Sequence, residues 1–321
     1  MAKPRVSVVI PCYNTGRYLR EAIESVLAQT AAAREIVVVD DGSTDDSPSI
    51  AAGIPGVRLL KQANQGVSEA RNHGLQETEG EYVVFHDADD RLLPRAIEIG
   101  LEQLEARPEC AFVYGFSRHI GPNGAPLDID PPARVEDAGY ARMLAGSGLT
   151  PPSCALFRRS AIEAVGGFSR SEEPSEDHGF YLRVSQRHPV YCHNQVVAEY
   201  RRHPLNASGI SASRTLRAVF RTLERQRPSV RGRPELEQAL REGKRHYGQV
   251  FGEALGFEVI EQLRRGALVR AAGTFGLALR YHPRGLLDAA SHYGARLGGR
   301  ARSQPPLQAD AVSPAPPQKH E

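Results

Sequence analysis

The stretch Tyr82–Asp90 constrains the fold of this chain more than any other. Four consecutive apolar residues, Tyr82–Phe85, predict a short strand that is buried on both faces, as in a parallel sheet. Three carboxylates, Asp87, Asp89 and Asp90, follow where this strand has to emerge. Because burial of several unpaired carboxylates is costly, we expect a cation near this end of the strand.

A divalent metal ion is the simplest such cation. Asp87 and Asp89 are two positions apart, so in an extended chain both side chains point to one side. Hard cations such as Mg²⁺ and Mn²⁺ prefer oxygen ligands and usually keep bound waters and phosphates. The stretch alone leaves an alternative open, a polar strand end at which Asp89 or Asp90 caps a helix that begins near Pro94.

Apolar runs alternate with helical patterns along the first third of the chain. Strands are expected at Val6–Ile10, Ile36–Val39 and Val57–Leu60, in addition to Tyr82–Phe85. Helices are expected at Tyr18–Leu27, Val67–Gln76 and Pro94–Glu105. A strand, a helix and a second strand in succession form a right-handed βαβ unit. The sequence therefore predicts an α/β fold with a doubly wound, Rossmann-like and mostly parallel sheet.

Polar segments follow three of the expected strands, at Pro11–Asn14, Asp40–Ser43 and Asp87–Asp90. Ligands bind beyond the carboxyl ends of the strands in such sheets, so all three segments are expected to line one cleft. Asp40 can accept a hydrogen bond from a base or ribose, and Tyr13 can stack on a ring. The alternative for Asp40–Ser43 is a tight turn with a helix cap.

Three further side chains are candidates for the site, and each has an ordinary alternative. Arg71, on the helix after the turn Asn64–Gly66, suits a diphosphate, although a helix arginine more often lies on a solvated face. Asp177 stands at the start of an expected helix, where a carboxylate commonly serves as a cap. His203 follows a strand expected at Val196–Tyr200 and is either a third metal ligand or a surface histidine.

The charge is unevenly distributed, with a net −9 over Met1–Tyr200 and +12 over Arg201–Arg302. From about Leu216 the pattern is helical, and the run Gly266–Leu279 is too short and too charged to span a bilayer. As an amphipathic basic helix it can lie on an anionic membrane surface, or it can belong to a helical subdomain packed on the body. The stretch Gln304–Glu321, with five prolines, is predicted to be disordered.

The remaining composition limits the compartment and the chemistry. We expect no signal peptide, since Met1–Arg5 runs directly into a short strand, and no apolar run approaches the ~20 residues of a membrane span. The four cysteines are far apart and predict neither a zinc site nor a disulfide framework, which suits a reducing cytoplasm. Cys12 is expected to be a structural thiol, because no orienting base is apparent.

Taken in order, these segments resemble the family 2 glycosyltransferases, which are inverting enzymes of GT-A fold. The resemblance covers about Val6–Ser208. It rests on six motifs in the family's order, namely Val8–Asn14, Ile36–Asp45, Asn64–Gly66 with Ala70–Asn72, Asp87–Asp90, Gly166–Phe168, and Glu176–Asp177 with Leu182 and Arg183. One departure is that Leu182 and Arg183 are adjacent, where many members space these residues further apart.

The resemblance implies a set of donor-binding residues. Pro11, Tyr13 and Asp40 would hold the base and ribose of a nucleotide sugar. Asp41 would assist them, and Arg71 would lie near the base or the diphosphate.

The resemblance also implies a Mn²⁺ or Mg²⁺ site. Asp87 would meet the ribose or the metal, and Asp89 would bind the metal that bridges the diphosphate. Ala88, between them, would lie against the nucleotide sugar. His203 resembles a histidine that some members use near the metal or the diphosphate.

By the same resemblance, Asp177 matches the catalytic base and Glu176 its acidic neighbour at the nucleotide sugar. Inverting transfer needs a base opposite the leaving nucleotide, to take the proton of the attacking hydroxyl, and a cation to stabilise the departing diphosphate. One catalytic carboxylate is enough, because the metal replaces the general acid that a glycoside hydrolase requires.

The sequence thus predicts a metal-dependent glycosyltransferase of the hexosyltransferase type, acting in cell-surface or exopolysaccharide synthesis. It would move a sugar from a nucleotide diphosphate donor, with a UDP-sugar preferred, to a hydroxyl of a saccharide or lipid-linked acceptor. The expected place is the cytoplasm, with peripheral association at the inner face of the cell membrane, and no nucleic acid partner is expected.

Two alternatives stay open. A sugar-phosphate nucleotidyltransferase would carry a basic, Gly-rich phosphate loop after the first strand, and Pro11–Asn14 is neither basic nor Gly-rich. The second alternative is a non-catalytic module that binds nucleotide sugars. For all three functions the expected organisation is a GT-A domain over 1–210, a basic helical C-terminal extension over 211–302 and a disordered Pro-rich tail over 303–321.

Overall fold

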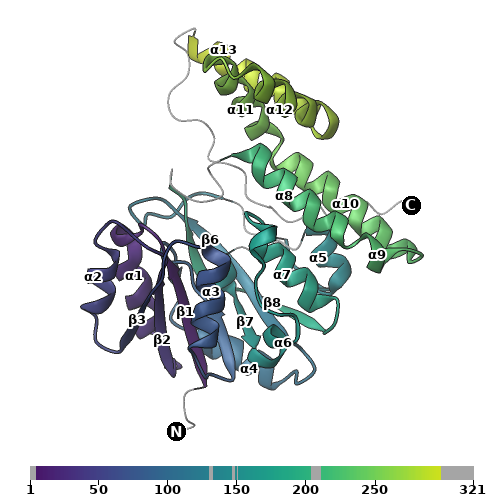
Figure 1. Cartoon of the computed structure of the whole chain (residues 1–321). Coiled ribbons are helices and arrows are strands. Elements are labelled where there is room, and N and C mark those ends of the chain that lie inside the picture. Colours follow the sequence, from purple (N-terminus) through teal and green to yellow (C-terminus); the bar gives the residue numbers. More distant parts are fainter. Residues whose placement is uncertain (1–4, 130–132, 147–148, 150, 204–210, 298–321) are drawn as a thin grey trace. The chain divides into compact units, whose positions relative to one another are not determined.

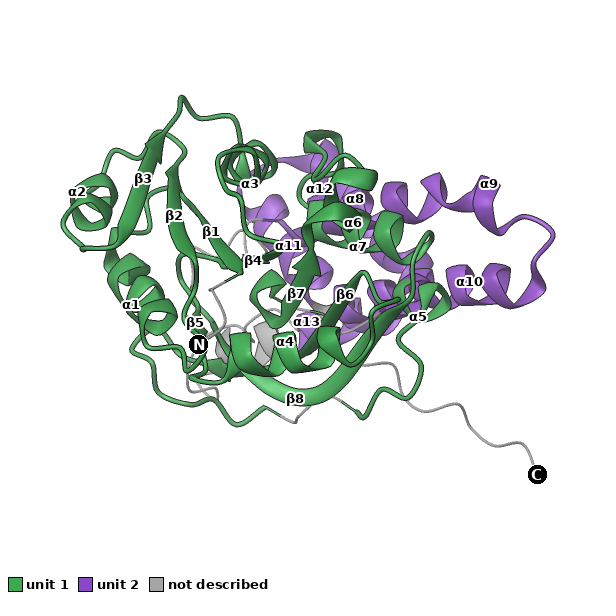
Figure 2. Ribbon diagram, turned by 90° about the horizontal axis from the view of Figure 1, so that it is seen from below, with its two compact units in different colours: residues 1–143, 148–203 green, residues 144–147, 204–321 purple. Residues whose placement is uncertain are grey.

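The computed structural model describes residues 5–129, 133–146, 149, 151–203 and 211–297 (Figure 1). Contacts divide the chain into two compact units, which Figure 2 distinguishes by colour. The first unit comprises Met1–Met143 and Gly148–His203, and the second comprises Leu144–Ser147 and Pro204–Glu321. The domain boundary predicted at residue 210 and the tail predicted over 303–321 lie outside the described residues.

The first unit is built on one eight-stranded sheet with the order β3-β2-β1-β4-β7-β6-β8-β5. The strands are β1 (Val6–Cys12), β2 (Glu35–Asp40), β3 (Val57–Lys61), β4 (Tyr82–Phe85), β5 (Arg91–Leu92), β6 (Phe112–Ile120), β7 (Ala155–Arg158) and β8 (Val190–Arg201). The segment β3-β2-β1-β4 is entirely parallel. Beyond it the sheet is mixed, because β7 is antiparallel to both β4 and β6, whereas β8 is parallel to β6 and β5 is antiparallel to β8.

The helices of the first unit cover both faces of this sheet, with α3 and α7 on one side and α1 and α4 on the other (Figure 2). They are α1 (Gly16–Leu27), α2 (Ser47–Ala52), α3 (Val67–Gln76), α4 (Ala96–Glu105), α5 (Tyr140–Gly146, which ends in the second unit), α6 (Arg159–Ala164) and α7 (Glu176–Ser185). The limits of β4 and α3 are those predicted, and the other elements predicted in this half differ only at their ends. The continuous apolar runs of β1, β2 and β4 contain no exposed residue, which explains why they were predictable.

Close packing of α3 on the sheet fixes the position of the residues that this helix carries. A Cβ atom on Gly74 would lie only 2.3 Å from Cγ1 of Val9 and 3.1 Å from Cγ2 of Val39. Glycine at this position therefore lets α3 approach β1 and β2 closely. One helical turn earlier, Arg71 bonds to Asp87, which follows the carboxyl end of β4.

Two local expectations are wrong. The chain does not stay extended after β4, because the N–H of Asp90 donates to the carbonyl oxygen of Asp87 at 3.2 Å and forms a turn. Neither Asp89 nor Asp90 caps α4, which begins after Arg95. Before β7 the chain forms a 3₁₀ turn, η1 (Pro152–Cys154).

The described residues of the second unit form helices and no strands. These are α8 (Ala212–Arg225), α9 (Arg227–Val230), α10 (Pro234–Val250), α11 (Gly252–Arg264), α12 (Leu268–Tyr281) and α13 (Pro283–Leu297). Leu255, Ala278 and Ala289 form a fully buried core among α11, α12 and α13. Across the described ranges, no helix combines the length and the apolar character that crossing a membrane requires.

Candidate functional site

Arg71 lies at the centre of a buried network of charges. Its side chain is 4% exposed; Nη2 donates to Oδ1 of Asp87 at 2.8 Å and Nη1 donates to Oε1 of Glu176 at 3.0 Å. The guanidinium also lies over the ring of Phe168, 5.0 Å from its centroid. Burial acts to lower the pKa of Arg71, but the charges of Asp87 and Glu176 outweigh it and raise this pKa. The solvated face considered for Arg71 is therefore wrong.

Glu176 and Asp177, the first two residues of α7, differ in environment. Glu176 is buried, and its burial, with the charge of Asp177, raises the pKa of Glu176 to about 7 in spite of the nearby Arg71. Asp177 is half-buried and accepts a hydrogen bond from the N–H of His178 at 2.6 Å. Asp177 is therefore the second residue of the helix and not its N-cap, which is Ser175, and it still reaches solvent beside the network of Arg71.

The turn after β4 concentrates negative charge. Asp90 is fully buried; its Oδ1 accepts from the N–H of Arg201 at 2.9 Å, and its Oδ2 has no hydrogen-bond partner in the described part of the chain. Burial, together with the charges of Asp89 and Asp87, raises the pKa of Asp90 well above its usual value. Burial also raises the pKa of Asp87, although Arg71 opposes this shift. The turn therefore favours a cation at its solvent side.

Arg201, at the end of β8, holds this turn from behind. Its side chain is fully buried, and Nε donates to the carbonyl oxygen of Asp89 at 2.8 Å while Nη2 donates to Oε2 of Glu21 at 2.6 Å. The sequence reasoning missed Arg201, although it counted Asp90 among the three carboxylates that need a cation. The available signal was that a buried carboxylate needs a cationic partner, which the arginine pair before His203 supplies.

His203 is buried, so the surface histidine considered as its alternative is wrong. Its Nε2 lies 2.9 Å from Oδ2 of Asp89, and its ring lies 4.8 Å from that of Tyr18. The structure therefore brings His203 to the acidic turn, as the resemblance implied.

The fit of these residues to a divalent cation can be judged from their donor atoms. Among the described residues, no group of three or more His, Cys, Asp or Glu side chains could hold a metal ion by itself. Mg²⁺, however, is usually bound by one or two carboxylates together with phosphates and waters. Oδ2 of Asp89 and Nε2 of His203 are 2.9 Å apart, at hydrogen-bond distance from each other. Half-buried Asp87 and Asp89 thus fit a cation that a bound diphosphate would complete.

Asp40 and Asp41 shape the loops at the ends of β2 and β3. Both are buried, and Oδ1 of Asp40 accepts from the N–H of Ser43 at 3.1 Å, which is the tight turn considered for this segment. Asp41 accepts from the N–H of Gln65 at 2.8 Å and from that of Gly66 at 2.9 Å. Asp41 therefore ties the β2–α2 loop to the turn that begins α3.

Sheet register brings the three polar segments to one edge. Cys12, at the end of β1, pairs with Asp40, and the N–H of His86 donates to the carbonyl oxygen of Val9 at 2.9 Å. Pro11 and Ala88 are buried within these segments, whereas the ring of Tyr13 is 49% exposed. An exposed ring at this edge is available for stacking.

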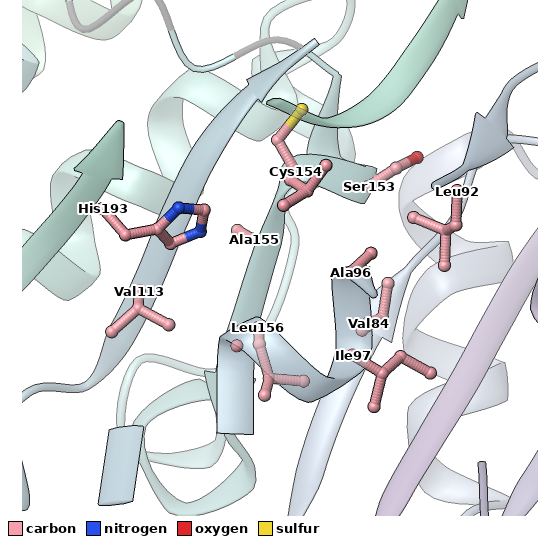
Figure 3. Close-up of a pocket in the computed structure, with 12 residues that line it drawn as sticks. Val84, Leu92, Ala96, Ile97, Val113, Ser153, Cys154, Ala155, Leu156 and His193 are labelled. Atoms are coloured by element: carbon pink, nitrogen blue, oxygen red, sulfur yellow. The ribbon is translucent and has the colours of Figure 1, made fainter. Parts of the chain in front are cut away.

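A small internal cavity lies next to the acidic turn but is not part of the site. Figure 3 shows Val84, Leu156 and Ile97 among its mostly apolar lining, with Ser153, Cys154 and His193 as polar members. Its volume is about 10 Å³, which is room for one water molecule. A cavity of this size is too small for a nucleotide.

The sequence of this chain is similar to that of known proteins. The sequence model of glycosyl transferase family 2 matches residues 7–166. Chondroitin synthase of Escherichia coli is 31% identical over 203 residues, 60% of this chain and 29% of that protein. Hyaluronan synthase of Pasteurella multocida is 27% identical over 203 residues, 60% of this chain and 20% of that protein. The chain thus spans less than a third of either relative.

Solved structures of similar fold extend the likeness beyond the family match. S. aureus TarS 1–349, in complex with UDP-GlcNAc, has a TM-score of 0.65 at 17% identity and covers 93% of both chains. The mannosyltransferase PcManGT from Pyrobaculum calidifontis, in complex with GDP-Man and Mn²⁺, has a TM-score of 0.60 at 20% identity, over 92% of this chain and 81% of that chain. These neighbours have the GT-A fold, and the predicted fold class is confirmed.

Proposed function

This chain belongs, through residues 7–166, to glycosyl transferase family 2, and from this premise we propose that it moves a sugar from a nucleotide diphosphate donor to a hydroxyl of a saccharide or lipid-linked acceptor. A UDP-sugar is the preferred donor, because TarS is described in complex with UDP-GlcNAc. Relatives named for chondroitin and hyaluronan synthesis support a role in the synthesis of a polysaccharide. Family membership makes the chain a glycosyltransferase and favours neither alternative considered from the sequence.

One observation carries the proposal. Arg71 bonds both Asp87, after β4, and Glu176, at the start of α7, although Glu176 is 105 positions away in the sequence. This link supports a single site in which Asp177 faces the donor across from the acidic turn. Arg71 is then a positioning residue, since Nη1 and Nη2 both already bond to protein carboxylates.

Proton transfer is the task that we assign to Asp177. In an inverting displacement the acceptor oxygen attacks the sugar carbon as the bond to the diphosphate breaks, and a carboxylate takes the proton of the attacking hydroxyl. Asp177 is suited to this role because it is half-buried, so that an acceptor can reach it. Glu176 is suited to holding Arg71 and not to meeting the acceptor, because it is buried in the ion pair.

Donor binding involves the other residues of the edge. Tyr13 would stack on the base, with Pro11, Asp40 and Ala88 shaping its pocket, and Asp41 would fix the loop before α3. Asp87, Asp89 and His203 would hold Mn²⁺ or Mg²⁺, which would supply positive charge for the departing diphosphate.

We also propose that this reaction takes place in the cytoplasm, with the enzyme peripheral at the inner face of the cell membrane. All four cysteines of the sequence are free thiols, which suits a reducing compartment.

Substitution of Asp177 by Asn tests the proposal. The purified protein is incubated with Mn²⁺ and a panel of UDP- and GDP-sugars, and sugar transfer or donor hydrolysis is measured. Asp177→Asn should lower turnover by about 10²–10⁴-fold, because the amide cannot accept the proton, while the Kd for the nucleotide stays unchanged. Asp288→Asn, an exposed residue of α13, is the matched control and should keep full activity. Unchanged turnover in Asp177→Asn would refute the role of the base.

A further inference from the structure

Helix α12 has an unusual distribution of side chains. Its fully or nearly buried residues, Ala271, Thr274 and Ala278, are all small. The large apolar residues Leu268, Phe275 and Leu279 are 66%, 46% and 55% exposed. Spacings of seven and four positions put these three residues in one stripe along the helix, which we call the apolar stripe. An ordinary packed helix would turn such large residues inward.

Further large apolar residues are exposed beside the apolar stripe in α12 and in the neighbouring helices α11 and α13. Val269, next to the apolar stripe, is 89% exposed, Leu263 of α11 is 51% exposed and Leu287 of α13 is 71% exposed. Single exposed apolar residues are common on protein surfaces, but here several large ones are exposed within 25 residues of sequence, from Leu263 to Leu287. Such concentrations mark a surface that contacts a partner or a membrane.

The sequence segment that contains the apolar stripe is positively charged. The sequence has no Asp or Glu between Glu261 and Asp288, but it has five arginines there. Arg264 and Arg265 pair with Glu261, whereas Arg270, Arg280 and Arg284 have no ion pair within the described residues. We refer to these last three residues as the arginine set.

We propose that the apolar stripe inserts into the interface of an anionic lipid membrane, with the arginine set at its headgroups. Large apolar residues combined with uncompensated arginines are what an interfacial helix presents to anionic lipid. A second copy of the chain is disfavoured as the occupant, because it would bring two acid-free arginine surfaces together. The apolar stripe also does not suit a nucleic acid, whose backbone offers it no apolar contact.

Binding to a membrane would bring the enzyme to the proposed lipid-linked acceptor. This link between the membrane surface and the acceptor rests on the proposed function. Lipid binding is measured without turnover, however, so the two proposals fail separately. If Asp177→Asn keeps activity, the base is wrong and the membrane surface is untouched. If vesicles do not bind, the membrane surface is wrong and the base is untouched.

A single introduced tryptophan provides the sharpest test, because the chain contains none. In Phe275→Trp, vesicles of phosphatidylglycerol and phosphatidylcholine should shift the emission to the blue, and brominated acyl chains should quench it. Leu27→Trp, at an exposed position in the first unit, is the matched control and should show neither effect. Unchanged emission of Phe275→Trp with anionic vesicles would overturn the proposal.

Sedimentation of the full chain with vesicles separates the contributions of the two sets. Replacing the apolar stripe by Gln should weaken binding about tenfold or more, and replacing the arginine set by Gln should do the same and remove the dependence on salt. The control replaces Arg221, Arg233 and Arg241, exposed arginines of the same unit, and should retain most of the binding. Equal binding to vesicles of phosphatidylcholine alone, or an equal loss in the control, would contradict the proposal. Self-association in place of lipid binding would assign the face to a second copy.

Discussion

Glu176 is the residue whose ionisation couples the site most directly to pH. Because the pKa of Glu176 is raised from 4.5 to about 7, the folded state binds this proton more tightly than the unfolded state. The contribution of Glu176 to stability is therefore full below about pH 4.5 and is lost as the pH rises to about 7. Glu176→Gln cannot titrate, so the free energy of unfolding of the variant relative to wild type should rise by up to about 3 kcal/mol across this window. Urea unfolding at several pH values measures this difference in the free energy of unfolding between Glu176→Gln and wild type. A difference that stays constant with pH would show that Glu176 does not titrate between about pH 4.5 and 7.

The place of a residue in the site could be predicted only where its residue type and its position after a strand were enough to indicate it. Asp87 and Asp89 were singled out because carboxylates after a buried strand need a cation. The burial of Arg71 could not be predicted, since one of its partners is 105 positions away. Arg201 was missed for the same reason, because it bonds to Glu21 across 180 positions. Apart from the need of the buried Asp90 for a cationic partner, nothing in the sequence separates such an arginine from one on a solvated face.

At the level of elements, replacement of glycine by alanine should have opposite effects on stability in two helices, because only α3 packs closely on the sheet at its glycine. Gly74→Ala forces a methyl group into Val9 and Val39, so we expect a loss of about 1–2 kcal/mol in spite of the better helix propensity of alanine. Gly276→Ala, in α12, meets nothing within 4 Å and should gain about 0.5–1 kcal/mol. Thermal and urea unfolding measure both variants. A neutral Gly74→Ala would mean that α3 does not pack this closely.

The apolar pattern of the sequence was enough to predict some strands of the sheet but not others. The parallel strands were predictable because both of their faces are apolar. Only Val196–Tyr200 was expected as a strand, whereas β8 runs over Val190–Arg201, because its polar stretch His193–Gln195 interrupts the apolar pattern. The insertion of antiparallel β7 between β4 and β6 could not be predicted, since such pairing depends on contacts between distant segments.

At the scale of the whole molecule, the cysteines report on the opening of the first unit. All four are buried there, and burial raises the pKa of Cys12, Cys110, Cys154 and Cys192. A thiol reagent should therefore label the native protein slowly and label four thiols per chain in denaturant. Nucleotide with Mn²⁺ at 100 times its Kd should slow labelling by about 100-fold, since it binds only the folded unit. Fast labelling that nucleotide does not change would contradict this expectation.

The link made by Arg71 limits how far such an enzyme can be trimmed. The match to the family ends at residue 166, before the acid that pairs with this arginine. A polypeptide cut there would retain a recognisable signature but would leave a guanidinium half-neutralised in its interior and would lack position 177. A match to the family signature alone would therefore also be found in a truncated copy that lacks the proposed base, Asp177.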